Sequence, residues 1–417
     1  MKKIVIKGKK DLTGEINISG AKNSVVALIP AAILTDDEVT ITNVPRLSDT
    51  INLERILNLL GCEIEFGKGV LKINSKNLKN EAIPEEFSNK LRASYYFMGA
   101  LLARFKRVEI YFPGGCVIGA RPIDLHIKGF KKLGATVITD GDKFILTAEK
   151  LRGANIYLDF ASVGATVNLM LAASLAEGQT VIENAAKEPE IINIADFLNS
   201  MGAKVSGAGT SEIIIEGVEE LHDGEITVIP DRIEAGTYVI MGALLGNNLV
   251  IEGIVKEHLD SLFSKLSEAE CDFKIEDNKV IISKTDNLKP VNIKTLVYPG
   301  FPTDLGQPMS TLLTQCNGDS VFEETIYENR MRHIKYLNEM GANIDLDGKI
   351  AVIHGKTNLQ GKNVEATDLR AGAAMLVAGM IAEGKTEITN IEHILRGYEN
   401  IVEKLSAVGA NVKLVDE

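Results

Sequence analysis

Apolar and polar positions repeat along the chain in six similar blocks. In each block a helical pattern ends at a short motif that leads into a strand: "LNLLGCEIEF", "FKKLGATVIT", "LNSMGAKVSG", "LSEAECDFKI", "LNEMGANIDL" and "LSAVGANVKL". The residues at these helix ends, which are 73, 68, 68, 71 and 68 positions apart, are Gly61, Gly134, Gly202, Glu270, Gly341 and Gly409. Glycine just past a helix is typical of a left-handed cap, where a Cβ atom would be strained. The pattern therefore predicts six structural repeats.

A second pattern with the same period lies between these motifs. Each of four segments runs from a turn through a strand and a polar stretch into an apolar helix: "LTGEINISGAKNSVVAL", "LRGANIYLDFASVGATVNLM", "LHDGEITVIPDRIEAGTYVIM" and "LQGKNVEATDLRAGAAMLV". A strand follows each helix, so one repeat is β-α-β-α-β-β in outline. These helices are apolar nearly all round, which predicts that they lie inside, with the sheets outside them. The predicted fold class is α/β, as an inside-out barrel.

The length of 417 residues is too great for one ordinary core, which favours two domains of three repeats each. An alternating strand pair precedes the first apolar helix and can complete a sheet of the other group. We therefore expect one domain at 21–229 and a second at 1–20 plus 230–417, with the active site in the cleft between them.

Composition excludes several classes of function. A net charge of −12 and the absence of tryptophan leave no global basic face for nucleic acid. The longest apolar runs are shorter than the roughly 18 to 20 residues of a membrane span, and the first residues lack the pattern of a signal peptide. The four cysteines form no CxxC or Cys/His cluster, which argues against zinc and disulfides. We expect a cytoplasmic protein without a metal ion.

Polar residues stand where the apolar helices are expected to begin: Lys22, Asn23, Arg92, Ser162, Gly164, Asp231, Glu234, Asp304, Asp368 and Arg370. Helix N-termini bind phosphate and carboxylate groups through their free N–H groups and dipole. Helix capping is the more ordinary explanation for Ser162, Asp231, Asp304 or Asp368 taken alone. Cations oppose the dipole, so Lys22, Arg92 and Arg370 favour an anionic ligand.

Two arginines, Arg121 and Arg396, precede the glycine motifs of their repeats by the same 13 residues, where the second helix of each repeat is expected to begin. Pro122 fits a first helical turn. Paired arginines suit bidentate binding of carboxylate or phosphate, although a surface ion pair would explain either one singly. Cys116 lies just upstream, in the glycine-rich stretch "PGGCVIGARP". A loop thiol near cations is a candidate for reaction, whereas the other three cysteines have the apolar or strand contexts of packed thiols.

Together these residues match a known family. The sequence resembles the UDP-N-acetylglucosamine 1-carboxyvinyltransferases (enolpyruvyl transferases) along its whole length. The motifs that carry the resemblance are "GAKN" (20–23), "LRASYY" (91–96), "PGGCVIGARPIDLH" (113–126), "SVGAT" (162–166), "FPTDLGQP" (301–308), "TIYENR" (325–330), "ATDLRAGA" (366–373) and "RGYE" (396–399). The resemblance implies a two-domain inverted α/β barrel that closes on its substrates, and a role in peptidoglycan synthesis.

The resemblance also implies the site residues. Lys22, Arg121 and Arg396 would hold phosphoenolpyruvate, with Arg370 nearby. The residues that would contact the nucleotide sugar are Asn23, Arg92, Arg121, Pro122, Ile123, Asp124, Leu125, Ser162, Val163, Gly164, Asp304 and Ile326. One position departs from the family, because some members have a lysine next to "SVG" where this chain has Phe160 and Ala161.

The residue types suit addition and elimination without a metal or an organic cofactor. Cys116 would be the general acid that protonates phosphoenolpyruvate, and Asp304 the base for the sugar 3-hydroxyl. We expect a monomer or weak oligomer whose partners are phosphoenolpyruvate and UDP-N-acetylglucosamine. The alternatives are a shikimate 3-phosphate enolpyruvyl transferase, which the cysteine loop disfavours, and a catalytically silent paralogue that binds a UDP-sugar.

Overall fold

The structure is a computed structural model that describes residues 2–90, 92–111 and 123–416. The chain divides into two compact units: unit 1 contains residues 2–19 and 230–416, and unit 2 contains residues 20–111 and 123–229. Each unit has a separate hydrophobic core. Within the part of the chain that the structure describes, no helix has the length and apolar character needed to cross a membrane.

Unit 1 contains three four-stranded sheets among its described residues. Their strands, in spatial order within each sheet, are β21 (Asn363–Glu365), β22 (Lys385–Thr389), β1 (Lys2–Lys7) and β23 (Asn411–Asp416); β15 (Asp272–Glu276), β16 (Lys279–Ser283), β14 (Leu249–Glu252) and β2 (Glu15–Asn17); and β17 (Ile293–Lys294), β18 (Asp319–Glu323), β20 (Ile350–His354) and β19 (Asn343–Asp347). The two N-terminal strands thus pair with strands from the C-terminal half, β2 in parallel with β14 and β1 antiparallel to both β22 and β23.

The sheets of unit 2 repeat this arrangement. Their strands, in spatial order, are β13 (Glu225–Thr227), β3 (Glu38–Thr42), β5 (Val70–Asn74) and β4 (Glu63–Gly67); β11 (Lys204–Ser206), β12 (Glu212–Glu216), β10 (Gln179–Glu183) and β9 (Asn155–Tyr157); and β6 (Arg107–Tyr111), β8 (Lys143–Thr147) and β7 (Thr136–Asp140). Four-stranded sheets in both units combine a parallel pair, such as β13 with β3, and antiparallel pairs, such as β3 with β5. The fold class is therefore α/β, as the sequence predicts.

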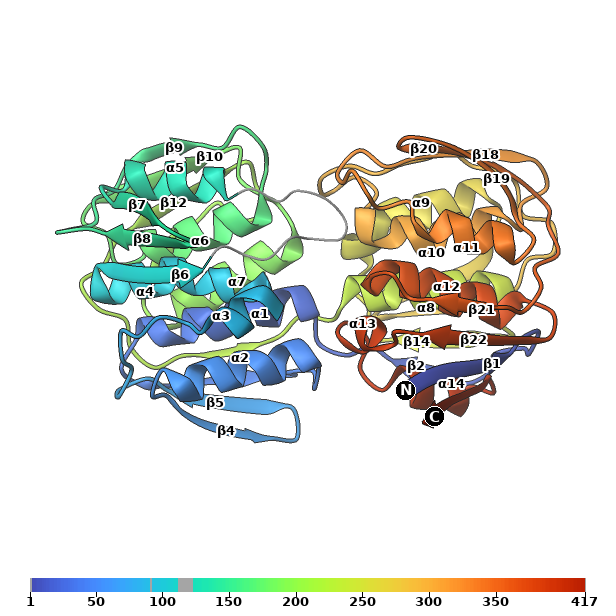
Figure 1. Ribbon diagram of the computed structural model, residues 1–417, viewed down its shortest axis with the longest axis horizontal. Helices are drawn as coiled ribbons and strands as arrows, with labels where there is room; N and C mark the ends of the chain where they lie inside the picture. The colour runs from blue at the N-terminus through green and yellow to red at the C-terminus, as the bar shows by residue number, and fades with distance from the viewer. Residues whose placement is uncertain (1, 91, 112–122, 417) are drawn as a thin grey trace. The chain divides into compact units, whose positions relative to one another are not determined.

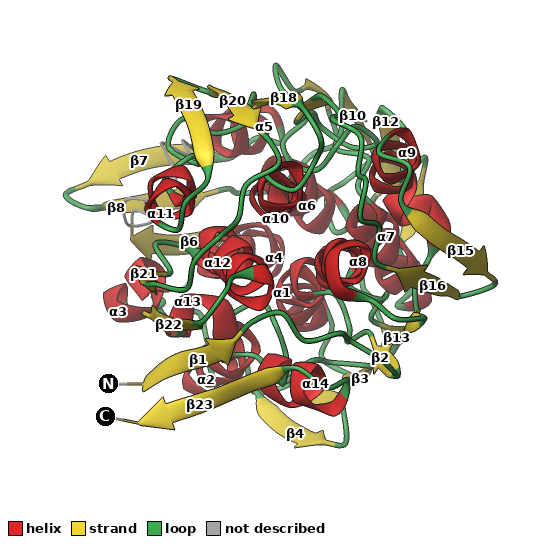
Figure 2. Cartoon of the chain, turned by 90° about the vertical axis from the view of Figure 1, so that its right-hand side faces the viewer, coloured by secondary structure: helices red, strands yellow, loops and turns green. Residues whose placement is uncertain are grey.

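Among the described residues, six apolar helices lie in the cores: α1 (Lys22–Ala31), α4 (Phe97–Phe105), α6 (Val163–Ala173), α8 (Arg232–Leu245), α10 (Thr303–Leu313) and α12 (Leu369–Ile381). In unit 1, α8, α10 and α12 contact one another, and the strands lie around them (Figures 1 and 2). All the residues of α6 after Val163 are buried, which agrees with its unbroken apolar pattern.

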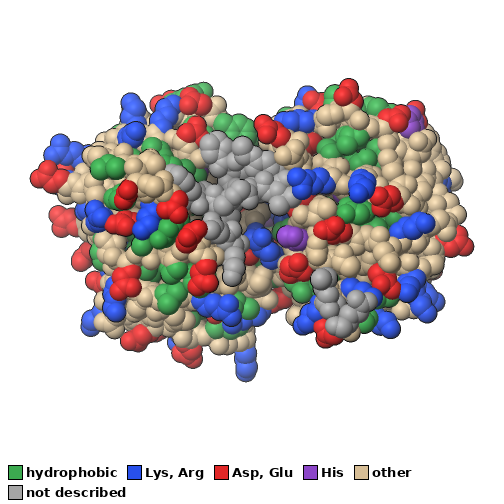
Figure 3. All heavy atoms as spheres, in the orientation of Figure 1, with side chains coloured by type: hydrophobic (Ala, Val, Ile, Leu, Met, Phe, Trp, Pro, Cys, Tyr) green, Lys and Arg blue, Asp and Glu red, His purple; other side chains and the backbone are tan. Residues whose placement is uncertain are grey.

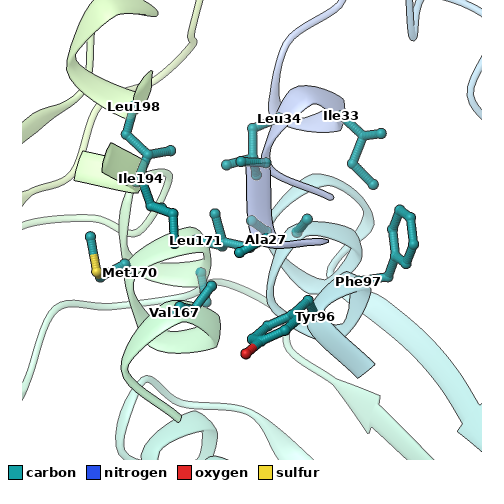
Figure 4. Close-up of a cluster of buried hydrophobic side chains, with 14 of the residues drawn as sticks. Ala27, Ile33, Leu34, Tyr96, Phe97, Val167, Met170, Leu171, Ile194 and Leu198 are labelled. Carbon is teal, nitrogen blue, oxygen red and sulfur yellow. The ribbon is translucent and has the colours of Figure 1, made fainter. Parts of the chain in front are cut away.

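In unit 2 the side chains of the inner helices converge on one cluster (Figure 4). The labelled residues, which come from α1, η1 (Ala32–Leu34), η2 (Arg92–Tyr96), α4, α6 and α7 (Pro189–Ser200), are Ala27, Ile33, Leu34, Tyr96, Phe97, Val167, Met170, Leu171, Ile194 and Leu198. Every one of them is at most 8% exposed. Each Å² of apolar surface removed from water contributes about 25 cal/mol to the folding free energy. The cluster therefore stabilises the packing of the inner helices.

The remaining helices are shorter or amphipathic: α2 (Ser48–Leu59), α3 (Glu85–Lys90), α5 (Asp124–Lys132), η3 (Lys256–Leu259), α9 (Asp260–Glu268), α11 (His333–Glu339), α13 (Glu392–Leu395) and α14 (Ile401–Ala407). On the face drawn in Figure 3, basic and acidic side chains lie among one another over each unit.

The six motif residues adopt the left-handed conformation that the sequence predicts. The φ angles of Gly61, Gly134, Gly202, Gly341 and Gly409 lie between 91° and 104°, and Glu270 has a φ of 57°. The same chain reversal therefore occurs after helix α9 without a glycine.

Replacing Glu270 with Gly is expected to stabilise the protein by about 1 kcal/mol, because a left-handed non-glycine residue costs about 1–2 kcal/mol and glycine's greater freedom in the unfolded chain offsets part of that gain. The ion pair with Lys289 is 60% and 59% exposed at its two side chains, so its loss contributes little. Chemical denaturation would measure the change. Glu270→Ala is the matched control, since it removes the carboxylate and keeps the strain, and a gain as large in this variant would contradict the explanation.

Candidate active site

Asp304 lies between two arginines in unit 1. Its Oδ1 accepts from Nη2 of Arg330 at 2.6 Å, and its Oδ2 accepts from Nη2 of Arg370 at 2.9 Å. Burial alone would raise the pKa of Asp304, but the two guanidinium groups lower it well below its usual value. The carboxylate is therefore ionised at neutral pH, and its remaining lone pairs can accept from a substrate hydroxyl.

Asp304 does not cap its helix, contrary to the capping prediction. Helix α10 begins at Thr303 with Pro302 as the N-cap, and Asp304 lies in the first turn with its side chain directed to the arginines. The capping prediction is correct for Ser162, Asp231 and Asp368, whose side chains accept from backbone N–H groups of α6, α8 and α12.

Two of the three predicted cations, Lys22 and Arg370, have carboxylate partners within their own units. Arg370, which is 3% exposed, pairs with Asp304 and also donates to the hydroxyl of Tyr398 at 3.3 Å. Lys22, the first residue of α1, lies 3.4 Å from Oδ2 of Asp49, in the first turn of α2. The positions of these positive charges can therefore be explained without an anionic ligand. A bound anion would neutralise them further.

Glu234 also has a structural partner. Asp231 caps α8, and the Glu234 carboxylate accepts from the backbone N–H of Ser19 at 2.8 Å and from Nζ of Lys404 at 2.7 Å. Burial raises the pKa of Glu234 to about 7, and Lys404 partly offsets that rise. This carboxylate fastens the N-terminal segment to α8 and α14 within unit 1.

Arg396 does not lie at a helix start, so this prediction is wrong. It is the C-cap of the four-residue helix α13, and α14 begins only at Ile401, after Asn400 in a left-handed conformation. The segment that follows Arg396 is fixed from two sides, since the Tyr398 hydroxyl bonds Thr237 at 2.9 Å and Glu399 accepts from Ser19 at 2.8 Å. The half-buried Arg396 is thereby held on an ordered turn.

The start of α6 packs tightly in unit 2. Ser162 caps it through Ala165, and a Cβ atom on Gly164 would lie 2.6 Å from the Tyr95 hydroxyl and 3.0 Å from Nε2 of His126. Only glycine fits against these two rings. The rings themselves pack edge to face, with their centroids 5.3 Å apart. His126 is 4% exposed, which indicates a structural role for its ring.

Other predicted residues are placed only in part. Asn23 is half-buried in the first turn of α1, and Arg92 belongs to η2, so it does not begin the apolar helix α4, contrary to prediction. Helix α5 begins at Asp124 with Ile123 as N-cap, later than the predicted start. Cys116, Arg121 and Pro122 lie outside the described residues.

The described cysteines are packed, as predicted. Cys62 and Cys316 are 5% and 0% exposed, and Cys271 is half-buried. Burial raises the pKa of each of these three thiols to about 12. They are therefore protonated and unreactive at neutral pH.

The position that departs from the resembled family is exposed. The Phe160 side chain is 50% exposed, and the neighbouring Asp159 pairs with Lys128 of α5 at 2.7 Å. Among the described residues no group of three His, Cys, Asp or Glu is placed to hold a metal ion.

Comparison with known proteins decides the family. Residues 6–405 match the EPSP synthase (3-phosphoshikimate 1-carboxyvinyltransferase) family. UDP-N-acetylglucosamine 1-carboxyvinyltransferase 2 of Bacillus subtilis (strain 168) is 52% identical, over 100% of this chain and 98% of the relative. The protein of the same name from Streptococcus mutans serotype c (strain ATCC 700610 / UA159) is 52% identical over 100% of both chains. The chain belongs to the UDP-N-acetylglucosamine 1-carboxyvinyltransferase family.

Solved structures agree with membership of this family. The enolpyruvyl transferase NikO from Streptomyces tendae matches with a TM-score of 0.91 at 25% identity, over 99% of both chains. An EPSP synthase from Acinetobacter baumannii shares the fold, with a TM-score of 0.77 at 17% identity over 100% of both chains. As a UDP-N-acetylglucosamine 1-carboxyvinyltransferase family member, the chain is a transferase.

Sequence reasoning missed several residues that complete these clusters. Arg330 and Tyr398 lie inside the quoted motifs "TIYENR" and "RGYE", and their charge or hydroxyl could have signalled a role. Asp49 is the acid in the first turn of a predicted helix, but nothing in the sequence pairs it with Lys22.

Proposed function

We propose that this protein transfers the enolpyruvyl group of phosphoenolpyruvate to the 3-hydroxyl of UDP-N-acetylglucosamine, with release of phosphate. The observation that carries this function is the identity of 52% over full length to enzymes named for this reaction. The product is the first committed intermediate of peptidoglycan synthesis, which places the protein in cell-wall formation and hence in cell shape and division. We propose a cytoplasmic enzyme that acts as a monomer or weak oligomer.

The proposed reaction balances without a cofactor. Carbon C3 of phosphoenolpyruvate gains a proton from the Cys116 thiol, and the sugar 3-oxygen bonds to C2, which has become electrophilic. The Cys116 thiolate then takes a proton back from C3 as phosphate leaves C2, which gives the enolpyruvyl ether and restores the thiol. The proton of the sugar hydroxyl leaves with the phosphate. Cations around the tetrahedral intermediate stabilise its charge.

Cationic side chains hold the first substrate in this proposal. Lys22, Arg121 and Arg396 bind the phosphate and carboxylate of phosphoenolpyruvate, and Arg370 lies nearby. The two arginines keep the Asp304 carboxylate ionised and leave lone pairs that can accept from the sugar hydroxyl, while the lowered pKa makes it a weaker base than an ordinary carboxylate. It takes up the hydroxyl proton as the new C–O bond forms.

The second substrate has contacts from several elements. The residues that we propose to bind the nucleotide sugar are Asn23, Arg92, Arg121, Pro122, Ile123, Asp124, Leu125, Ser162, Val163, Gly164, Asp304 and Ile326. We also propose that the chain is an inverted α/β barrel of two domains, 21–229 and 1–20 plus 230–417, each with three βαβαββ repeats.

A phosphate-release assay tests this function. Release from phosphoenolpyruvate should require UDP-N-acetylglucosamine and should not occur with shikimate 3-phosphate in its place. Release with shikimate 3-phosphate alone would assign the other transferase activity. Binding of the UDP-sugar without any release would instead identify a catalytically silent paralogue.

A further inference from the structure

A buried carboxylate in unit 1 holds a backbone turn. Glu324, which directly follows β18, is 1% exposed. Its Oε1 accepts from the backbone N–H groups of Ile326 at 2.7 Å and Tyr327 at 3.1 Å, and from the Thr295 hydroxyl at 3.0 Å. The 325–327 turn is therefore folded around this one oxygen atom.

The other carboxylate oxygen connects the turn to Asp304. Glu324 Oε2 accepts the hydroxyl proton of Thr303 at 2.7 Å. A hydroxyl has only one proton to donate, so toward Arg330 the Thr303 oxygen must act as the acceptor. It accepts a hydrogen bond from Nη1 of Arg330 at 3.0 Å. Nη2 of the same guanidinium donates to Asp304 at 2.6 Å. These hydrogen bonds therefore form a series with one direction: Arg330 donates to Thr303, and Thr303 donates to Glu324.

We propose that Glu324 is a positioning residue for the transfer reaction. It sets the orientation of Arg330, and through it of the Asp304 carboxylate, while it fixes the backbone of Ile326. Asp304 and Ile326, which lie at the two ends of this series of hydrogen bonds, are both assigned to the nucleotide sugar. This proposal therefore rests on the proposed function. Glu324 itself touches neither substrate.

The arrangement explains why a carboxylate occupies this buried position. Charged groups are costly to bury unless they are fully hydrogen-bonded, and Glu324 accepts four hydrogen bonds, two from backbone N–H groups and two from threonine hydroxyls. An amide cannot replace it without loss. Three donors converge on Oε1, so an introduced amide must place its oxygen there and its NH₂ group toward Thr303. The Thr303 hydroxyl proton then has no acceptor, and the hydrogen bond from Thr303 to residue 324 is lost.

Steady-state kinetics of Glu324→Gln test the proposal. We expect kcat/KM for UDP-N-acetylglucosamine to fall roughly tenfold or more, as for loss of a buried charge-assisted hydrogen bond, with the KM for phosphoenolpyruvate within about twofold of wild type. The matched control is Glu323→Gln, at the end of β18, where the carboxylate is 35% exposed and pairs with Lys294. This control should keep wild-type kinetics. Wild-type sugar kinetics in a folded Glu324→Gln protein would overturn the proposal.

Two variants of Thr303 give a second test that does not depend on folding of the Glu324 variant. Thr303→Ser keeps the hydroxyl and should stay within about threefold of wild type, whereas Thr303→Val should reproduce the roughly tenfold loss. A purely structural role would lower the melting temperature and leave the two substrates' kinetics unchanged in the folded fraction. Equal kinetics of the two variants would also overturn the proposal.

The function itself is judged separately, on phosphate release by the wild type. If no phosphate is released, calorimetric binding of UDP-N-acetylglucosamine to the same variants replaces the kinetics. A roughly tenfold weaker Kd for Glu324→Gln and Thr303→Val, with Thr303→Ser near wild type, would support the positioning role. Equal affinities would reject it.

Discussion

Asp304→Asn should lower kcat by about 100-fold or more, while the affinity for UDP-N-acetylglucosamine stays within a few fold. An amide cannot take up the proton of the sugar hydroxyl, and general bases typically contribute a factor of about 10² to 10⁴. The amide oxygen can still accept from one of the two arginines, whereas its NH₂ group cannot accept from the other. The sugar keeps its other proposed contacts, so binding suffers less than turnover. Single-turnover phosphate release and calorimetric binding would measure the two quantities.

The pH dependence of stability provides a separate measurement on the same variant. Arg370 and Arg330 hold the pKa of Asp304 well below its ordinary value of 3.8. A carboxylate with a lowered folded-state pKa contributes stability above its unfolded pKa, and this is lost as the pH falls through the folded-state pKa. The free energy of unfolding should therefore be lower in Asp304→Asn at neutral pH, and the difference should shrink only below about pH 4.

Asp260→Asn is the control for both measurements, since this aspartate is 57% exposed and forms a surface ion pair with Lys256 at 2.6 Å. It should leave turnover and stability nearly unchanged. An Asp304→Asn enzyme with near-normal turnover would remove Asp304 from the proton transfer.

Features set by short stretches of sequence were predictable. The left-handed residues after helices follow from glycine at a fixed spacing, and the recurrence of the motif identified Glu270 as their equivalent. The caps at Ser162 and Asp231 follow from side chains that can accept from the next turn. The burial of α6 follows from its unbroken apolar pattern.

Features set by distant residues were not predictable in this way. Asp304 has the residue type of a cap, but its side chain pairs with Arg330 and Arg370, which lie 26 and 66 positions further along the chain. No local periodicity reports such a pairing. Arg396 was misplaced because a four-residue helix and the left-handed Asn400 interrupt what reads in the sequence as one helix.

Fosfomycin, a small epoxide phosphonate, is expected to alkylate Cys116 and to leave the other cysteines intact. Cations assigned to phosphoenolpyruvate would hold the phosphonate beside the thiol, and a thiolate sulfur then opens the epoxide. Cys62, Cys271 and Cys316 have pKa values of about 12 because they are buried, so almost none of each is thiolate at neutral pH. Peptide mass mapping after treatment in the presence of UDP-N-acetylglucosamine would locate the adduct, and an adduct on another cysteine would contradict this selectivity.

Cys116→Ser should lower kcat by about 100-fold or more, because a hydroxyl is far too weak an acid to protonate phosphoenolpyruvate at neutral pH. Cys116→Asp should retain activity and resist fosfomycin, because a carboxyl can carry the proton but does not open the epoxide as a thiolate does. Cys271→Ser is the matched control, since it makes the same change at a half-buried thiol that the reaction does not use. It should keep wild-type turnover and wild-type sensitivity to the inhibitor. Phosphate release with and without fosfomycin measures all three variants, and an active Cys116→Ser enzyme would assign this thiol to packing rather than to proton transfer.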